Sequence, residues 1–545
     1  MTMSTHRHNA PWWQTAVFYQ IYPRSFQDSN GDGVGDLKGI TSRLDYLSEF
    51  GVDALWISPF FKSPMRDFGY DISDYRAVDS LFGGMDDFRE LLAAAHGRGI
   101  RVVIDLVVNH SSDEHPWFVE ARSSRSNPNH DWYIWRPMNG PRRPNNWVSL
   151  FEQKSAWQPN PATGEWFLGT FTRNQPEFDW RNPELRKAIY DVARFWLDLG
   201  ADGFRMDVAT AYVKDDQFRS NPFKWNLSPD IFQEHIYDRN RPEVHGIFRE
   251  FRAVAQSYPG DRVLIGETHG RDPALAASCH GSGDELHMAF NFEFLFSPWG
   301  ARAFRERAER WYKLLPQGAW PNFTLSNHDQ RRHYARYGKR DADARARVAA
   351  AMLLCLRGTP FLYYGEEIGM TCRRLGRAAL RDPLGIATWP LSGYGRDPER
   401  TPMQWEDSPG AGFTSGTPWL PVNPDFPTRN VRAQMADPGS LWSWYAGLIR
   451  LRKAEPALAL GSLTWLDAPP DVMAWTRELD GRSVSVYLNF GPRRRELAVR
   501  GGSALAAWSP TRGYGKGEPN RGDAVPAGRR VLEGYGILIV GEGTR

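Results

Sequence analysis

The chain has 545 residues, and 67 lysines and arginines nearly balance 64 aspartates and glutamates, for a formal net charge of +3. A chain of this length can bury a large core in more than one domain, and its near neutrality gives no indication of a polyanionic partner such as a nucleic acid. Three widely spaced cysteines, no signal-peptide core and no apolar run long enough to span a bilayer favour a cytoplasmic protein outside any membrane.

Strand and helix patterns alternate along most of the chain. Eight segments are predicted as strands, some nearly all apolar like parallel strands buried on both faces, at 17–23, 53–59, 101–110, 202–207, 262–267, 286–292, 322–327 and 360–364. Helices follow most of them, at about 39–50, 88–97, 182–200, 243–256, 301–314 and 342–357. Eight parallel strands with right-handed helical crossovers close into a barrel, so we predict an α/β protein built on a (β/α)₈ TIM barrel.

Two regions break this alternation. Residues 111–181 are rich in Trp, Pro and Asn without a helical period, and short alternating strands begin near residue 460. We therefore predict a catalytic barrel domain, an inserted domain after the third strand and a C-terminal antiparallel β-sandwich domain. Their predicted extents are residues 1–110 with 182–458, residues 111–181, and residues 459–545.

Polar side chains gather where the predicted barrel strands end. Catalytic groups of such barrels lie at the carboxyl ends of the strands. Here these ends supply His110 after the third strand, Asp207 after the fourth, Glu267 after the fifth, and His328 and Asp329 after the seventh. Three carboxylates at one rim are hard to explain by packing alone, because burying each of them costs free energy. We expect them to converge at one mouth of the barrel.

The fourth strand carries a charged pair beside its apolar residues. Because alternate side chains of a strand share a side, Arg205 and Asp207 point one way while Phe204 and Met206 pack the other way. A guanidinium beside a carboxylate favours the ionised acid, as a carboxylate nucleophile requires. On this stretch alone, an ordinary ion pair at a strand end is an equally good interpretation.

Seven motifs resemble those of the α-amylase family of glycoside hydrolases (family 13). Four are similar to its signature regions: DLVVNH (105–110), GFRMDV (203–208), IGET (265–268) and SNHD (326–329). Three more are similar to its α-glucosidase and oligo-1,6-glucosidase branch: YQIYPRSF (19–26), GYDISDY (69–75) and RTPMQW (400–405). The resemblance covers essentially the whole chain. It implies a retaining, exo-acting α-glucosidase that acts on short α-glucosides of the maltose, isomaltose and sucrose type.

The resemblance also implies how the three carboxylates divide the chemistry. Asp207 would be the nucleophile, Glu267 the general acid/base, and Asp329 the third acid, which holds hydroxyls of the bound sugar. Retaining glycosidases need two carboxyl groups about 5–5.5 Å apart, a spacing that adjacent barrel strands can provide. Glu267 needs a raised pKa to carry a proton, and a neighbouring Asp329 would push it that way while Arg205 keeps Asp207 ionised.

Further residues are implied in substrate binding. His110 and His328 would donate hydrogen bonds to sugar hydroxyls, and Tyr70 would stack beneath the glucose ring. Asp67 and Arg400 resemble the pair that closes the pocket around the non-reducing glucose. On the residues alone, two structural histidines, a core aromatic and a surface ion pair are the alternatives.

A calcium-type loop precedes the first predicted barrel helix. Residues 28–36 place oxygen donors at loop positions 1, 3, 5 and 9 with glycine at position 6, but Gly39 stands where an EF-hand needs glutamate. The family carries a similar loop, so the resemblance implies a structural Ca²⁺ or Mg²⁺ and no organic cofactor. The implied ligands are Asp28, Asn30, Asp32, the Val34 carbonyl and Asp36, and the alternative is an Asx-rich turn.

Linkage preference depends on fewer residues. Val208 follows Asp207, and in the resembling branch valine here accompanies α-1,6 substrates, whereas a smaller or hydroxylated residue accompanies α-1,4 substrates. Residues 209–239 depart from the oligo-1,6-glucosidase pattern, and residues 287–292 look more like those of broad α-glucosidases. One contact shifts discrimination by only a few kcal/mol at most. The choice between α-1,4 and α-1,6 therefore stays open, and we expect both linkages to be cleaved.

Three other functions stay open. A glucosyl transferase or isomerase, such as a sucrose isomerase or trehalose synthase, shares the catalytic acids and differs in how well it excludes water. A non-catalytic interaction protein resembling amino-acid transporter heavy chains would have a membrane helix and lack the carboxylates, and this sequence shows neither feature. The C-terminal domain by itself could pass for a carbohydrate-binding module.

Overall fold

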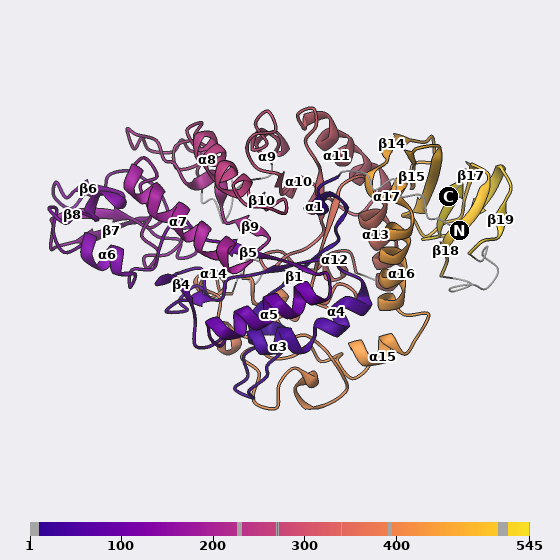
Figure 1. The fold of residues 1–545 in the computed structure, drawn as a ribbon, viewed down its shortest axis with the longest axis horizontal. Coiled ribbons are helices and arrows are strands. Elements are labelled where there is room, and N and C mark those ends of the chain that lie inside the picture. Colours follow the sequence, from indigo (N-terminus) through magenta and orange to yellow (C-terminus); the bar gives the residue numbers. More distant parts are fainter. Residues whose placement is uncertain are drawn as a thin grey trace.

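The molecule is elongated, with the barrel at its centre. Figure 1 shows a small sheet of the insertion at one end and the C-terminal sheets at the other. This computed structural model describes residues 10–225, 232–268, 270, 272–338, 340–390, 395–510 and 521–543. Of the segment 209–239 singled out above, residues 226–231 lie outside the described residues. Within the described residues, no helix is both long enough and apolar enough to cross a membrane.

Eight parallel strands form the central sheet, as predicted. Hydrogen-bonded neighbours follow the order β11-β10-β9-β5-β2-β1-β13-β12, and every adjacent pair is parallel. The strands are β1 (Phe18–Ile21), β2 (Ala54–Ile57), β5 (Arg101–Leu106), β9 (Gly203–Met206), β10 (Val263–Gly266), β11 (Met288–Ala289), β12 (Asn322–Thr324) and β13 (Thr359–Tyr363). This arrangement confirms the predicted (β/α)₈ barrel.

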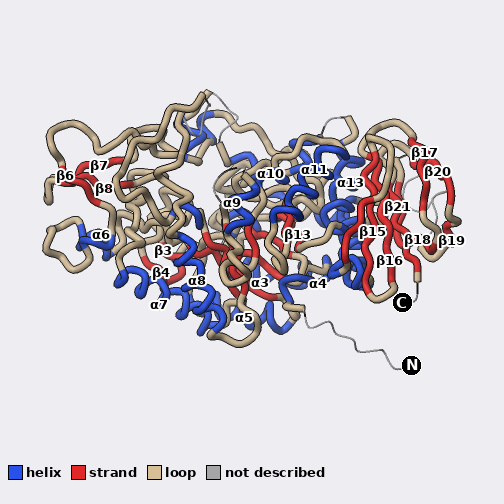
Figure 2. Tube along the Cα trace, turned by 90° about the horizontal axis from the view of Figure 1, so that it is seen from above, coloured by secondary structure: helices blue, strands red, loops and turns tan. Residues whose placement is uncertain are grey.

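Helices lie around these strands (Figure 2). The main ones are α5 (Met85–Gly97), α7 (Pro183–Leu199), α8 (Val244–Gln256), α11 (Ala301–Leu314), α13 (Ala342–Cys355) and α16 (Leu441–Ala454). The predicted helix at 39–50 is instead two helices, α3 (Leu37–Ser42) and α4 (Leu44–Phe50). They part at Arg43, whose backbone leaves the helical region while its guanidinium bonds Gln27 and lies 4.1 Å from the ring centroid of Trp405.

Antiparallel sheets stand on either side of the barrel. The insertion after β5 holds a three-stranded sheet of β6 (Trp135–Pro137), β8 (Glu165–Leu168) and β7 (Trp157–Asn160). The C-terminal region holds a six-stranded sheet of β14 (Ser462–Trp465), β15 (Val472–Leu479), β16 (Arg482–Asn489), β21 (Ile537–Glu542), β18 (Gly502–Trp508) and β19 (Ala524–Val525). A second, two-stranded sheet pairs β17 (Arg495–Val499) with β20 (Gly528–Leu532). The predicted insertion after the third strand thus contains a small antiparallel sheet, and the predicted C-terminal β domain is present.

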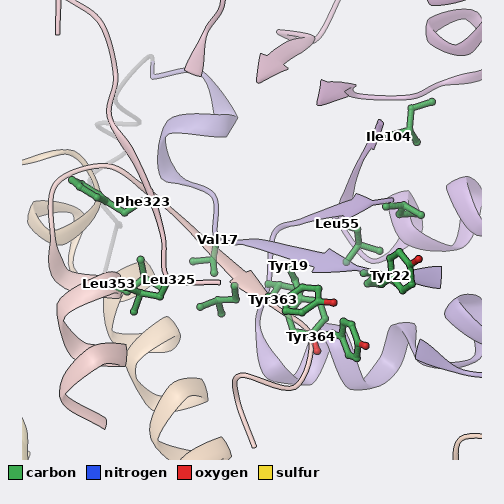
Figure 3. Packing of buried hydrophobic residues seen from close by; sticks show 14 of the residues in the cluster. Val17, Tyr19, Tyr22, Leu55, Ile104, Phe323, Leu325, Leu353, Tyr363 and Tyr364 are labelled. Carbon is green, nitrogen blue, oxygen red and sulfur yellow. The ribbon is translucent and has the colours of Figure 1, made fainter. Parts of the chain in front are cut away.

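Barrel side chains alternate between two cores. One cluster joins residues from several strands inside the barrel, including Phe18, Ala54, Val103, Ile265 and Phe361. The next residue along each strand, such as Tyr19, Leu55 or Ile104, belongs to the larger core that the barrel shares with its helices. Leu353 of α13 lies in the same core (Figure 3). The same alternation continues toward the strand ends. There the inward-facing positions are occupied by polar residues, among them Asp105 and Arg205.

Candidate active site

One buried guanidinium binds three carboxylates at the carboxyl ends of β5, β9 and β10. Arg205 lies in register with Asp105 on β5 and is 1% exposed. Its Nη1 lies 2.6 Å from Asp207 Oδ1 and 2.8 Å from Asp105 Oδ1, and its Nη2 lies 2.6 Å from Glu267 Oε2. Asp207 and Glu267, predicted from strands four and five, are therefore close neighbours. Because Arg205 and Asp207 are joined on one side of β9, the predicted strand alternation is confirmed.

The charge state of Asp207 differs from expectation. Burial raises the pKa of Asp207 well above its usual range, Arg205 acts in the opposite direction, and the nearby Glu267 and Asp105 raise it further. The prediction that Arg205 keeps Asp207 ionised is thus corrected, because one guanidinium is shared among three acids and burial opposes it. Acids this close titrate together, so the raised pKa of Asp207 reflects the whole cluster and not Asp207 alone.

Asp105 belongs to this cluster although the sequence analysis did not assign it a role. It is fully buried, its Oδ2 accepts hydrogen bonds from Trp56 Nε1 and Tyr70 Oη, and burial raises its pKa to about 6. A signal was present in the sequence. A lone aspartate within the apolar run RVVIDLVV must have a buried partner, because an isolated buried carboxylate is too costly.

Asp329 binds a second set of cations. Its Oδ1 lies 2.7 Å from Arg400 Nη2 and 3.4 Å from Arg396 Nη1, and its Oδ2 lies 3.3 Å from His328 Nε2. Burial alone would raise the pKa of Asp329, but His328 and the two guanidinium groups bring it well below its usual range. Asp329 is therefore an ionised carboxylate, which suits a residue that accepts hydrogen bonds from sugar hydroxyls.

The partner of Asp67 is a different arginine from the one predicted. Asp67 is buried, and its Oδ1 bonds Arg396 Nη2 at 2.8 Å. The predicted partner, Arg400, is occupied by Asp329 and by the carbonyl of His328, to which its Nε donates at 2.9 Å. Asp67 and Arg400 thus lie in the same charged network without pairing, and the predicted direct pair is corrected.

Arg396 is held in place by Asp382, which is fully buried. Asp382 Oδ1 accepts from Nε and Nη2 of Arg396 at 2.9 and 2.7 Å, and its Oδ2 accepts the main-chain N–H of Arg396 at 2.8 Å. The ring centroid of Phe151 lies 4.0 Å from the guanidinium carbon. Arg396 therefore reaches Asp67 and Asp329 from a fixed position. Both Asp382 and Arg396 lie in the long segment after β13, where no periodic pattern pointed to them.

The two histidines and Tyr70 are buried among protein partners. His110 Nε2 lies 3.0 Å from the carbonyl of Tyr70 and 3.0 Å from Gln175 Nε2, which also donates to Asp67. Burial lowers the pKa of His110 to about 3 and that of His328 well below its usual range, so both imidazoles are neutral near pH 7. The rings of Tyr70 and His328 are stacked, with centroids 5.5 Å apart. Their contacts with a sugar remain predictions.

Val208 packs at the boundary with the insertion. It forms a small apolar cluster with Phe171 and Ala211, against which Leu150 and Phe151 also pack. Its main-chain N–H donates to Glu267 Oε2 at 3.0 Å. Its effect on linkage preference stays a prediction.

The predicted metal ligands turn toward their own backbone. Asp28 accepts from the N–H groups of Asn30, Gly31 and Gly33. The carboxylate of Asp32 accepts from Val34 N–H, and that of Asp36 accepts from Ser29 and Gly39. Over the described part of the chain, no three His, Cys, Asp or Glu side chains gather as metal ligands would. These contacts are those of an Asx-rich turn, and cation binding by the loop stays a prediction.

Comparison with known proteins identifies the class. Residues 20–461 match the family described as "Alpha amylase, catalytic domain". The chain therefore belongs to the alpha-amylase family, which confirms the resemblance noted from its motifs.

Several relatives are similar over most of their length. A probable alpha-glucosidase of Rhizobium meliloti is 44% identical over 500 residues, covering 88% of this chain and 89% of the relative. An oligo-1,6-glucosidase of Parageobacillus thermoglucosidasius is 41% identical over 524 residues, covering 88% and 91%.

Solved structures agree with this placement. The alpha-glucosyl transfer enzyme XgtA superimposes with a TM-score of 0.90 at 42% identity, covering 98% of this chain and 100% of that one. The trehalulose synthase MutB from Pseudomonas mesoacidophila gives 0.87 at 35% identity, covering 98% and 99%. A mutant of MutB has been solved in complex with the substrate sucrose.

Proposed function

We propose that this protein is a retaining, exo-acting α-glucosidase that releases terminal non-reducing glucose from short α-1,4- and α-1,6-linked oligosaccharides. The observation that carries the proposal is the pair of acids, Asp207 and Glu267, bound to adjacent nitrogens of one buried guanidinium. A retaining glycosidase needs two carboxyl groups close enough to flank one glycosidic bond. The relatives named alpha-glucosidase and oligo-1,6-glucosidase support the substrate class.

The chemistry takes two steps. Asp207 attacks the anomeric carbon while Glu267 donates a proton to the departing glycosidic oxygen, which leaves a glucosyl ester on Asp207 and a released alcohol. Glu267, now ionised, takes a proton from water as that water attacks the same carbon and displaces Asp207. Two inversions restore the original anomeric configuration. A sugar hydroxyl in place of water gives transglucosylation.

This scheme requires one of the two acids to hold a proton before the first step. The raised pKa of Asp207 supports a cluster whose acids do not all ionise together. The mechanism needs the shared proton on Glu267 when substrate is bound. Asp329 carries a full negative charge against Arg396 and Arg400 and would stabilise a distorted sugar by accepting its hydroxyls.

An exo mode is favoured by the network around Arg396. Asp67, Asp329 and Asp382 all bond this arginine, and Asp67 and Asp382 are almost completely buried. We infer that this buried network closes one end of the substrate pocket. A pocket closed at that end would admit a chain end and exclude the middle of a long glucan.

A glucosyl transferase or sucrose isomerase is the second candidate. It is favoured by the similarity to the alpha-glucosyl transfer enzyme XgtA and to trehalulose synthase MutB. These activities share the ester step and differ in what attacks the ester. If this candidate is right, sucrose yields an isomeric disaccharide with little free glucose.

Product analysis tests both candidates. The enzyme is incubated with maltose, isomaltose, sucrose and soluble starch, and the products are resolved by anomer with proton NMR. We expect α-glucose at early times from maltose and isomaltose, and little release from starch. Early β-glucose would contradict a retaining mechanism. Rapid shortening of starch to mixed oligosaccharides would contradict the exo mode.

A further inference from the structure

The residue after the proposed nucleophile adopts a backbone conformation that valine rarely takes. Val208 has φ 37° and ψ 41°, in the left-handed region. This region is disfavoured for residues with a branched Cβ, and such outliers concentrate at functional sites. Gly203–Met206 before it is a regular strand and Ala209–Ala211 after it is a turn of 3₁₀ helix, so the outlier lies at the joint between two ordinary elements.

The left-handed turn sends two main-chain N–H groups to Glu267. Val208 N donates to Glu267 Oε2 at 3.0 Å, and Ala209 N donates to the main-chain carbonyl of Glu267 at 2.9 Å. Glu267 N in turn donates to the carbonyl of Met206 at 2.9 Å. The ends of β9 and β10 are therefore joined by three hydrogen bonds, of which only that from Val208 reaches a carboxylate.

These contacts make the two oxygens of Glu267 unequal. Oε2 accepts from Val208 N and from Nη2 of Arg205 at 2.6 Å. A carboxylate oxygen that accepts two donors has used both of its in-plane lone pairs, so a proton belongs on the other oxygen. The contacts thus leave Oε1 as the oxygen that carries the transferable proton.

We propose that the main-chain N–H of Val208 is a positioning group that holds Oε2 of Glu267 and so directs the catalytic proton to Oε1. The proposal rests on the function proposed above, in which Glu267 is the general acid. The left-handed turn is the structural requirement for this contact, because it brings the N–H of residue 208 round to β10.

The side chain of Val208 explains why the turn persists. It is 6% exposed and packs with Phe171 of the insertion and with Ala211. The backbone is thus fixed from two directions, by Glu267 on one side and by an apolar contact with the insertion on the other. A strained residue persists where its surroundings determine its conformation in this way.

An amide-to-ester exchange tests the proposal without changing any side chain. Val208 is replaced by its α-hydroxy acid analogue through nonsense suppression, which removes the N–H and keeps the isopropyl group. The matched control is the same exchange at Ala209, whose N–H bonds the main chain of Glu267 rather than its carboxylate. Rates are measured on maltose, which needs a protonated leaving group, and on an aryl α-glucoside, which does not.

We expect the Val208 ester to lower kcat on maltose roughly tenfold to a hundredfold, with a clearly smaller loss on the aryl glucoside. Because the N–H favours the ionised form of Glu267, its removal shifts the basic limb of the kcat profile to higher pH. The Ala209 ester lowers both rates equally and leaves that limb in place. Equal losses on both substrates for the Val208 ester, or an unshifted limb, would overturn the proposal.

Two further variants keep the test decisive. Glu267→Gln is measured in parallel: if its loss is the same on both substrates, the assignment of Glu267 as the acid fails, and the proposed function fails with it. If Glu267→Gln spares the aryl glucoside but the Val208 ester does not, only the positioning role fails. Should the ester variant not fold, Val208→Gly frees the turn while keeping the N–H. It is expected to lose more on maltose than on the aryl glucoside, and equal losses would contradict the proposal.

Discussion

Two acid-rich regions of this protein differ in where their carboxylates point. In the loop of residues 28–36, Asp28, Asp32 and Asp36 accept hydrogen bonds from main-chain amides of the same loop or of the helix that follows it. Around Arg205, the acids come from three separate strands and are joined by one buried guanidinium. The first set mainly shapes its own turn, although the Thr414 hydroxyl also donates to Asp28, whereas the second set can act only because the fold assembles it.

This difference shows what residue spacing can and cannot predict. A carboxylate satisfied by its own turn makes contacts that a short sequence motif already encodes. Carboxylates that share a cation across strands exist only in the folded barrel, where desolvation raises the pKa of Asp207 and of Asp105. Raised acid pKa values in a barrel mouth are a stronger functional indication than the number of acids in a loop.

Removing the nucleophile should separate the two regions most clearly. Asp207→Ala is expected to lower kcat/KM by at least about ten-thousandfold with little loss of stability, because its carboxylate lies at the mouth rather than in the apolar core. Asp32→Ala, in the loop, serves as the control and should keep near-normal kcat/KM. Steady-state kinetics and a thermal melt measure both variants. Substantial residual turnover by Asp207→Ala would contradict the assignment.

Glu367 is a buried acid outside both regions, and its partners are neutral hydroxyls. Glu367 Oε1 accepts from Tyr19 and Tyr46 at 2.6 and 2.7 Å, and burial raises its pKa from 4.5 to about 7. The folded protein therefore binds this proton more tightly than the unfolded chain, so its stabilisation is lost as pH rises from about 4.5 to about 7. The size of the loss is on the order of 3 kcal/mol.

Glu367→Gln is expected to weaken this pH dependence, because glutamine stays neutral and its oxygen can still accept from the tyrosines. Urea unfolding at pH 5 and pH 8 measures the change in the free energy of unfolding for both proteins. An identical change in the two would show that Glu367 is not the group responsible.

The next largest loss of activity is expected when Arg396 loses its partner Asp382. Asp382→Asn weakens charge-assisted hydrogen bonds to Arg396, so Asp67 and Asp329 lose a fixed partner. We expect kcat/KM on maltose to fall roughly tenfold to a hundredfold. If Asp382 acts through substrate binding, the fall appears mainly in KM, and Asp382→Ala loses more than Asp382→Asn.

A surface acid provides the matched control for Asp382. Asp86 pairs with Arg89 and its side chain is 96% exposed, so Asp86→Asn should leave kinetics and stability unchanged within error. If Asp382→Asn lowers the melting temperature but leaves KM and kcat as in Asp86→Asn, Asp382 has only a structural role.

Linkage preference should shift by a smaller factor. Val208→Thr adds a hydroxyl beside Asp207 at similar volume, and we expect the ratio of α-1,4 to α-1,6 cleavage to rise by roughly twofold to tenfold. Competition between maltose and isomaltose in one reaction measures this ratio directly. An unchanged ratio would remove the Val208 side chain from the specificity argument and leave only its main chain.

Cation binding at residues 28–36 carries the smallest effect. We propose that Ca²⁺ or Mg²⁺ binds there, and expect added Ca²⁺ to raise the melting temperature of chelator-treated protein by about 2–4 °C without changing kcat. Asp28→Asn should abolish the shift. No shift in the unaltered protein would leave the loop as an Asx-rich turn, in line with its amide contacts.

The barrel and its three strand-end acids could be predicted because the repeating strand-helix pattern places each strand end at one rim. Arg396 and Asp382 could not, since they lie in a long non-periodic segment whose position depends on tertiary contacts. The same limit applies to the partner of Asp67, which the motif resemblance places at Arg400 and the structure at Arg396. The left-handed backbone of Val208 could not be predicted either, because a β-branched residue such as valine disfavours this conformation.

Trapping the covalent intermediate tests the central claim most directly. A fluorinated glucosyl fluoride that forms the ester quickly but hydrolyses slowly is incubated with the enzyme, and the digested protein is analysed by mass spectrometry. We expect one added fluoroglucosyl group on the peptide containing Asp207, and none when Asp207 is replaced by alanine. A label on another residue, or inactivation without any covalent label, would contradict it.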